Sequence, residues 1–199
     1  MKVPYRVILS NPIYCLAFGF GSGFSPKAPG TFGTLTAIPF YLILSNFPAW
    51  IYAFLVGVAF FLGIWICGKT SRYLGVKDHS GIVWDEFVGY WITMFLAPVG
   101  WIWMLLGFCL FRVLDILKPW PIKYIDKNVK GGLGIMLDDV LAGIISSLVG
   151  EKKMKPIEAA SAGVWIHSKT AINLKKGIIA EDLIKNLKNT INYIYGKYS

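Results

Sequence analysis

Apolar residues gather in five stretches of the first 150 positions, covering residues 35–47, 50–67, 87–97, 101–111 and 133–149. A polar turn at 45–48 joins the first two, and Pro98-Val99-Gly100 joins the next two, so each pair is predicted to form a helical hairpin. Stretch 50–67 approaches the ~20 residues that a membrane-spanning helix needs, and the others are shorter. The pattern predicts an all-α, polytopic membrane helical bundle with short or re-entrant helices.

Composition supports lipid as the main solvent, because 55% of the residues are hydrophobic and only 16% are charged. A soluble domain usually carries about 25% charge. The net charge is +9, and the basic residues form no stripe with interleaved aromatic residues. This excess therefore indicates contact with a membrane and its anionic phospholipids, and no nucleic-acid partner is expected.

The basic residues follow a simple pattern along the two predicted hairpins. Lys27 precedes the first hairpin, a basic segment separates the hairpins, and another follows the second, whereas the two interhelical turns hold no Lys or Arg. If both hairpins dip through the membrane, every basic loop lies on one side, which is expected to be cytoplasmic. That side is also expected to hold segments 19–34, 85–86 and 112–121.

Seven acidic residues occur in the first 150 positions. Asp78 and Asp126 lie in polar loops, and we expect them only to solvate those loops. The other five adjoin or interrupt apolar helices, where a carboxylate costs about 2.5 kcal/mol or more unless it has a partner or a function. An oxygen-only ligand set suits Mg²⁺ or Mn²⁺. The predicted metal ligands are Asp85, Glu86, Asp115, Asp138 and Asp139.

A second candidate element is the glycine-rich segment 19–34, with five glycines before and within the start of a helix. Converging backbone amides, hydroxyl groups and a lysine would form a phosphate cradle. An ordinary Gly/Pro-rich loop beside a membrane helix is the alternative. The predicted phosphate-binding residues here are Ser22, Ser25, Lys27 and Thr31.

Arg112, Asp115 and Lys118 lie three residues apart and share roughly one helical face before Pro119 ends the helix. We expect Arg112 to clamp a phosphate group and Lys118 to assist it. The alternative is that both cations simply pair with Asp115. His79 precedes the first carboxylates and would serve as an acid for the leaving group, or else is only solvated.

The motifs that two common classes of phosphatase require are absent from the sequence. No cysteine is followed six positions later by arginine, and no Asp-x-Asp pair is present. Metal-assisted attack remains, with either water or a carboxylate that becomes transiently phosphorylated as the nucleophile. The predicted catalytic residues are Asp85, Glu86, Asp115, Asp139 and His79. A non-enzymatic membrane protein that binds or transports a divalent cation is the alternative from another class.

Three long segments resemble the phosphatidylglycerophosphatase A family in order and spacing, over about residues 11–148. They are GFGSGFSPKAPGTFGT, VKDHSGIVWDEFVGYWIT and FRVLDILKPWPIKYIDKNVKGGLGIMLDDVLAGII. The resemblance implies an all-helical fold and Mg²⁺-dependent hydrolysis of phosphatidylglycerophosphate in phospholipid biosynthesis. It also implies a multi-pass protein of the bacterial inner membrane, with the site facing the cytoplasm and an anionic phospholipid as substrate.

The last part of the chain departs from that family. Segments 156–167 and 177–184 resemble the C-terminal end of an NAD(P)H-hydrate dehydratase, so we expect a chimera of a membrane domain, 1–150, and a tail, 151–199. The tail is predicted to form two basic amphipathic helices, 156–172 and 179–195, without a catalytic site. Deletion of residues 152–199 is therefore expected to leave phosphatase activity intact, and its loss would contradict this division.

Overall fold

The computed structural model describes residues 5–76, 79–119 and 122–150. The chain divides into two compact units, Met1–Glu151 and Lys152–Ser199. The second unit lies outside the described residues, and so do the two predicted tail helices. The assignment of the tail as a separate domain without a catalytic site therefore stays a prediction.

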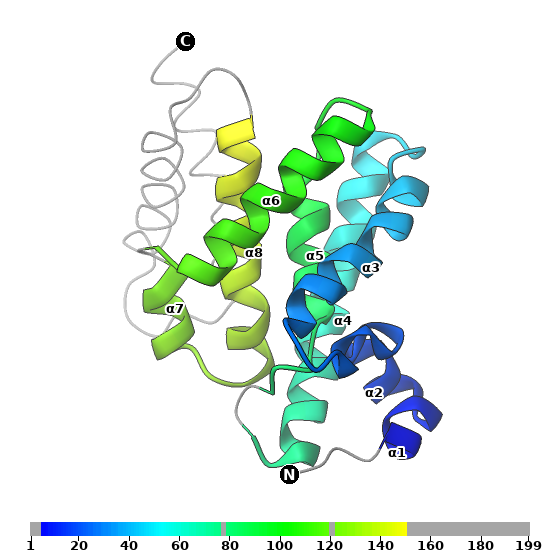
Figure 1. The fold of residues 1–199 in the computed structure, drawn as a ribbon, viewed down its shortest axis with the longest axis vertical. Coiled ribbons are helices and arrows are strands. Elements are labelled where there is room, and N and C mark those ends of the chain that lie inside the picture. Colours follow the sequence, from blue (N-terminus) through cyan, green and yellow to red (C-terminus); the bar gives the residue numbers. More distant parts are fainter. Residues whose placement is uncertain (1–4, 77–78, 120–121, 151–199) are drawn as a thin grey trace. The chain divides into compact units, whose positions relative to one another are not determined.

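The described part is all-helical, as the sequence predicted, and contains no strand (Figure 1). Its elements, in chain order, are α1 (Tyr5–Ser10), α2 (Pro12–Ala17), the 3-10 helix η1 (Gly19–Phe24), α3 (Pro29–Leu44), α4 (Ala49–Leu74), α5 (Trp84–Thr93), α6 (Trp101–Leu117), α7 (Ile122–Asn128) and α8 (Gly131–Gly150). The five apolar stretches correspond to α3, α4, α5, α6 and α8. Helix α4 runs on past Cys67 until Gly75 ends it in a left-handed conformation.

Helix α5 forms the centre of this bundle, and side-chain hydrogen bonds tie it to its neighbours. Trp84 Nε1 donates to Ala59 O of α4 over 3.0 Å, and Trp91 Nε1 donates to Ala37 O of α3 over 3.1 Å. Tyr90 Oη donates to Met104 O of α6 over 3.2 Å. Buried indole and phenol groups need such partners, so these bonds fix both the position and the rotation of α5.

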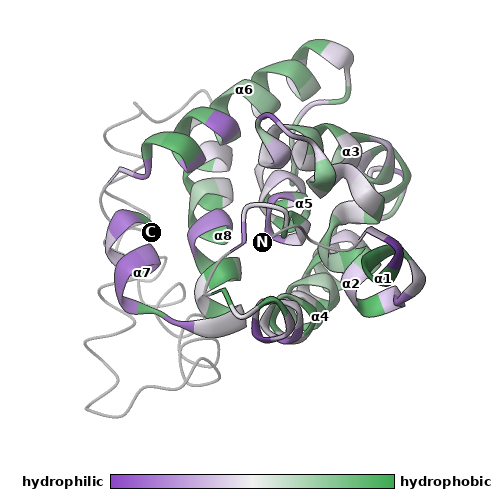
Figure 2. Ribbon diagram, turned by 60° about the horizontal axis from the view of Figure 1, so that its bottom comes forward, coloured by the Kyte–Doolittle hydropathy of each residue, from purple (hydrophilic) through white to green (hydrophobic). Residues whose placement is uncertain are grey.

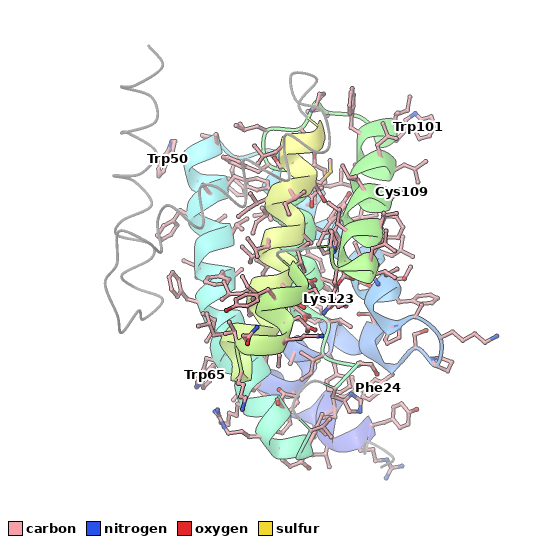
Figure 3. The ribbon with its side chains drawn as sticks, turned by 90° about the vertical axis from the view of Figure 1, so that its left-hand side faces the viewer. Phe24, Trp50, Trp65, Trp101, Cys109 and Lys123 are labelled. Carbon is pink, nitrogen blue, oxygen red and sulfur yellow. The ribbon has the colours of Figure 1, made fainter. Side chains whose placement is uncertain are left out.

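The outer surface of the bundle is apolar. On α4, one face exposes Trp50, Phe54, Val58, Phe61 and Trp65, each by 49–73%. Figure 2 shows α3, α4 and α6 as mostly hydrophobic, with short hydrophilic segments interrupting α6 and α8. Trp50 and Trp101 lie at the same end of the bundle, away from Phe24 (Figure 3). Such an extended apolar surface is typical of a protein that contacts lipid.

Two described helices are long and apolar enough to cross a membrane, namely α4 and residues 131–148 of α8. Helix α5 has only 10 residues, and α3 and α6 have 16 and 17. A span needs about 20 residues, so these shorter helices match the predicted short elements. How many of them cross the bilayer stays a prediction.

A buried carboxylate centre between three helices

The acidic centre begins at the first turn of α5. Val83 N donates to Ala17 O over 2.9 Å just before the helix starts, and the hydrogen bond of Trp84 then holds this turn against α4. Asp85 and Glu86 follow in the first turn, where the helix dipole favours negative charge. Only 9% of the surface of Glu86 is exposed. The α5 terminus therefore presents two carboxylates inside the bundle.

Helix α8 adds a third carboxylate, Asp139. One oxygen atom each from Asp85, Glu86 and Asp139 lies within 4.8 Å of the others. We call these three residues the acidic trio. Asp139 is itself only 2% exposed. In the trio, carboxylates that are far apart in the sequence meet at one place.

The trio forms because α5 and α8 cross at glycines. A Cβ atom on Gly143 would lie 2.5 Å from Gly89 O, and a Cβ atom on Gly89 would lie 2.8 Å from Asp139 O. Both distances are too short for a real side chain, so only glycine permits this approach. Small residues are the usual means by which helices pack closely in lipid.

Helix α6 contributes Arg112 and Asp115 at the edge of the trio. Arg112 Nη1 lies 2.7 Å from Asp115 Oδ2 and 3.8 Å from Glu86 Oε1. Arg112 Nε has no hydrogen-bond partner among the described residues. The sequence left open whether Arg112 pairs with Asp115, and the structure contains this ion pair. The pair leaves the Nε–H donor of the guanidinium without a partner among the described residues.

The start of α3 reaches the same point. A Cβ atom on Gly30 would collide with Glu86 Oε1 and would lie 3.0 Å from Arg112 Nη1. The glycine-rich segment therefore meets the site through the backbone of Gly30. Among its predicted phosphate-binding residues, Ser22 Oγ donates to Gly19 O, Ser25 Oγ donates to Lys27 O, and Lys27 is exposed. Thr31 is half-buried. Phosphate binding by these side chains stays a prediction.

Burial sets the protonation of the α5 carboxyls. It raises the pKa of Asp85 well above its usual range, and the charges of Glu86 and Asp139 raise it further. Burial also raises the pKa of Glu86 to about 7, and the charge of Asp115 adds to this while Asp85 and Arg112 oppose it. A nearby cation would reverse these shifts by favouring the charged forms.

The trio fits a divalent cation. Asp85 Oδ1 and Glu86 Oε2 are buried without a hydrogen-bond partner among the described residues. Unpaired buried carboxylate oxygens are costly, and a cation would satisfy both. The ligands are all oxygen atoms, which suits Mg²⁺ or Mn²⁺.

Asp138 does not belong to the trio and pairs with Lys118 instead. Lys118 Nζ contacts Asp138 Oδ2 at 2.6 Å and Asp126 Oδ1 at 3.1 Å. Burial lowers the pKa of Lys118, but these two carboxylates outweigh it and raise the pKa above its ordinary value. The expectation that Asp126 only solvates its loop is wrong, because it lies in α7 and faces Lys118. Metal binding by Asp138 and phosphate binding by Lys118 stay predictions.

His79 lies beside Gly81 and Phe18, and Phe18 comes just before the glycine-rich segment. Its Nδ1 accepts a hydrogen bond from Gly81 N over 3.0 Å, and its ring centre lies 5.8 Å from that of Phe18. The ring is half-buried. Its role as an acid for the leaving group stays a prediction.

The described residues form an all-helical bundle with an apolar surface and a buried acidic centre beside an arginine. The family model described as Phosphatidylglycerophosphatase A matches residues 15–151, so the chain belongs to that family. It is accordingly a phosphatase, a hydrolase of phosphoric monoesters, as the resemblance implied.

Relatives agree with this assignment. The chain is 49% identical over 143 residues to "Phosphatidylglycerophosphatase A" of Escherichia coli, covering 71% of this chain and 83% of the relative. It is 45% identical over 140 residues to a candidate phosphatidylinositol-3-phosphatase of Bacteroides thetaiotaomicron, covering 66% of this chain and 86% of the relative. No solved structure matches the chain.

A further relative matches only part of the chain. Over 67 residues the chain is 40% identical to the bifunctional NAD(P)H-hydrate repair enzyme of Vibrio cholerae, covering 31% of this chain and 13% of the relative. This match is compatible with the predicted chimera.

The residues that sequence reasoning missed are glycines. Gly89 and Gly143 bring the backbones of α5 and α8 together, yet neither carries a functional group. Gly30 belongs to the predicted glycine-rich segment, but the approach of its backbone to the side chains of Glu86 and Arg112 was not predicted. The only available signal was glycine inside apolar helices, where it is normally unfavourable and so indicates close packing.

Proposed function

We propose that this protein hydrolyses phosphatidylglycerophosphate to phosphatidylglycerol and inorganic phosphate, as a step of phospholipid biosynthesis. The observation that carries the proposal is the acidic trio beside Arg112, inside a bundle whose outer surface is apolar. A phosphate ester on a lipid matches both features. The family and the name of the Escherichia coli relative support this particular substrate.

The acidic trio is the proposed Mg²⁺ site. Asp85, Glu86 and Asp139 would hold the ion, and the unpaired oxygens of Asp85 and Glu86 support this assignment. When bound, Mg²⁺ supplies a Lewis acid that polarises the phosphoryl oxygens. Asp138 would contribute only from the neighbouring face of α8.

Arg112 is the proposed phosphate-binding residue. Asp115 holds its guanidinium at 2.7 Å, and the free Nε, together with the outer N–H groups, would donate to phosphate oxygens. Water attacks the phosphorus atom as the bond to the glycerol oxygen breaks, and that oxygen takes up a proton. The guanidinium stabilises the charge that develops on the phosphoryl group during this exchange.

We also propose that the protein is a multi-pass protein of the bacterial inner membrane with its site at the cytoplasmic face. The two long apolar helices and the exposed apolar surface support membrane insertion. The absence of Lys and Arg from the turns at 45–48 and 98–100, with basic residues at the opposite helix ends, supports the orientation.

The test is phosphate release by the purified full chain in detergent micelles. Phosphatidylglycerophosphate with Mg²⁺ should give release that EDTA abolishes and excess Mg²⁺ restores. Release that persists in EDTA would contradict the metal site. Phosphatidylinositol 3-phosphate serves as the second substrate, and release from it alone would contradict the proposed substrate. Mg²⁺ binding without release from either lipid would favour the non-enzymatic alternative.

A further inference from the structure

Lys118 joins three helices through one ammonium group. It follows α6 directly and adopts a left-handed backbone conformation, with φ 42°, while its N–H donates to Leu114 O over 2.9 Å. Its Nζ contacts Asp126 of α7 and Asp138 of α8. The end of α6 is thereby attached to both later helices.

The contact with Asp138 is the more enclosed of the two. The side chain of Asp138 is 8% exposed, compared with 37% for Asp126, and its distance to Lys118 Nζ is 2.6 Å. An unpaired carboxylate at such a position is strongly unfavourable, so Asp138 requires this cation. A buried ion pair is nevertheless weak evidence for stability, since apolar residues of similar size often serve as well. The pair therefore calls for a role beyond stability.

That role follows from the position of Asp138 next to Asp139. Consecutive helical residues point about 100° apart, since a turn takes 3.6 residues. On α8, Asp138 contacts Lys118 at the end of α6, and a carboxylate oxygen of Asp139 lies within 4.8 Å of oxygens of Asp85 and Glu86 on α5. A rotation of α8 that released Asp138 from Lys118 would also move Asp139 relative to the trio.

We propose that Lys118 is a positioning residue: its ion pair with Asp138 fixes the rotation of α8 and so holds Asp139 in the acidic trio. The inference rests on the proposed metal site. It assigns Lys118 a different role from phosphate binding. Asp115 lies three residues before Lys118, so the same attachment also fixes the end of α6 that carries the Arg112–Asp115 pair.

The test measures Mn²⁺ binding to the full chain in detergent, by electron paramagnetic resonance without substrate. Lys118→Met should weaken Mn²⁺ binding at least about tenfold, the usual effect of losing a residue that orients a metal ligand. It should also lower kcat while the KM for phosphatidylglycerophosphate stays within about twofold. Lys118→Arg should restore binding, because a guanidinium also pairs with Asp138. Lys127→Met, on the exposed face of α7, is the matched control and should bind as wild type.

A double-mutant cycle separates positioning from phosphate binding. If Lys118 acts through Asp138, Lys118→Met has no further effect on Mn²⁺ binding in an Asp138→Asn background. An unchanged Mn²⁺ affinity with a raised KM would overturn the proposal, and so would an equal loss of affinity in both backgrounds.

Where Lys118→Met does not fold, Lys118→Gln supplies the same comparison. Wild-type protein that binds Mn²⁺ but releases no phosphate would contradict the proposed function and leave this inference standing, whereas failure to bind Mn²⁺ would contradict both.

Discussion

Arg112 connects the acidic trio to the start of α3. Its guanidinium pairs with Asp115, approaches Glu86 to 3.8 Å, and lies against the backbone of Gly30. A guanidinium carries five N–H donors, so these contacts leave capacity for an anion. A residue with this geometry is suited to orienting a phosphoryl group beside a metal.

Substitution of Arg112 by lysine tests that role. Lysine keeps the charge but loses the planar fork, so Arg112→Lys should lower kcat/KM for phosphatidylglycerophosphate by roughly 100-fold. Arg72→Lys, at an exposed position in the last turn of α4, is the matched control and should keep wild-type kinetics. Unchanged kinetics in Arg112→Lys would exclude a phosphate contact.

Glu86 gives a pH-dependent prediction for the protein without metal. Its pKa is raised from 4.5 to about 7 in the folded state, so the folded protein binds more protons than the unfolded chain between these values. The corresponding stability is fully present below about pH 4.5 and is lost as the pH rises through about 7. The melting temperature in EDTA should therefore fall between pH 5 and pH 8, and Glu86→Gln should reduce this dependence. A melting temperature that rises over this range would contradict the assignment.

At the scale of elements, the crossing of α5 and α8 determines whether a site exists. Gly89 and Gly143 meet backbone to backbone, and the turn that precedes each glycine in its own helix carries the carboxylates of the acidic trio. The hydrogen bonds of Trp84 and Trp91 hold α5 against α4 and α3 at the same time. Helix packing and site geometry are thus set by the same contacts.

Gly143→Ala should separate α5 from α8. An added Cβ atom meets Gly89 O at 2.5 Å, so we expect a lower melting temperature and at least tenfold lower phosphatase activity. Gly57→Ala in α4 is the matched control, because its added Cβ atom meets nothing within 4 Å. That variant should gain about 0.5–1 kcal/mol from helix propensity and keep its activity. If the two variants had the same melting temperature and activity, the crossing of α5 and α8 would have room for a side chain, which would contradict this account.

The sequence predicted the helices well because apolar stretches and breaking turns are local signals. It also singled out the carboxylates that meet in the acidic trio, since charge inside an apolar helix is unusual whatever the fold. It did not predict the partners of Lys118. Spacing along α6 gave Asp115 as the alternative partner of Lys118, but the left-handed backbone at Lys118 ends the helix, and the ammonium meets α7 and α8 instead. At Gly30 and Gly143, the backbone of one helix comes close to residues that are distant in the sequence. These close contacts depend on the packing of the helices, which local sequence signals do not predict.

The whole bundle has two unlike ends. Trp50 and Trp101 begin α4 and α6 at one end (Figure 3), where the interhelical turns expose apolar residues such as Leu96 and Val99. The opposite helix ends lead into basic segments, including the exposed Lys123 and Lys127 of α7. This asymmetry is typical of a protein inserted with its basic side toward the cytoplasm.

Cysteine labelling tests this orientation. In a background without the native cysteines, Lys127→Cys should resist a membrane-impermeant maleimide in intact spheroplasts and react in inverted membrane vesicles. Val99→Cys, at the other end of the bundle, should not react preferentially in the inverted vesicles. Labelling of Lys127→Cys in intact spheroplasts would contradict a cytoplasmic active site.

The central claim is that the acidic trio performs the phosphatase reaction, and Asp139→Asn tests it most directly. The substitution keeps the size of the side chain and removes its charge, so binding of the proposed metal is lost while the bundle remains folded. The measurement is the rate of Mg²⁺-dependent phosphate release from phosphatidylglycerophosphate by protein with a wild-type melting profile. We predict a decrease of at least about 100-fold, beyond the usual effect of residues that only orient a ligand. A wild-type rate in Asp139→Asn would contradict the account.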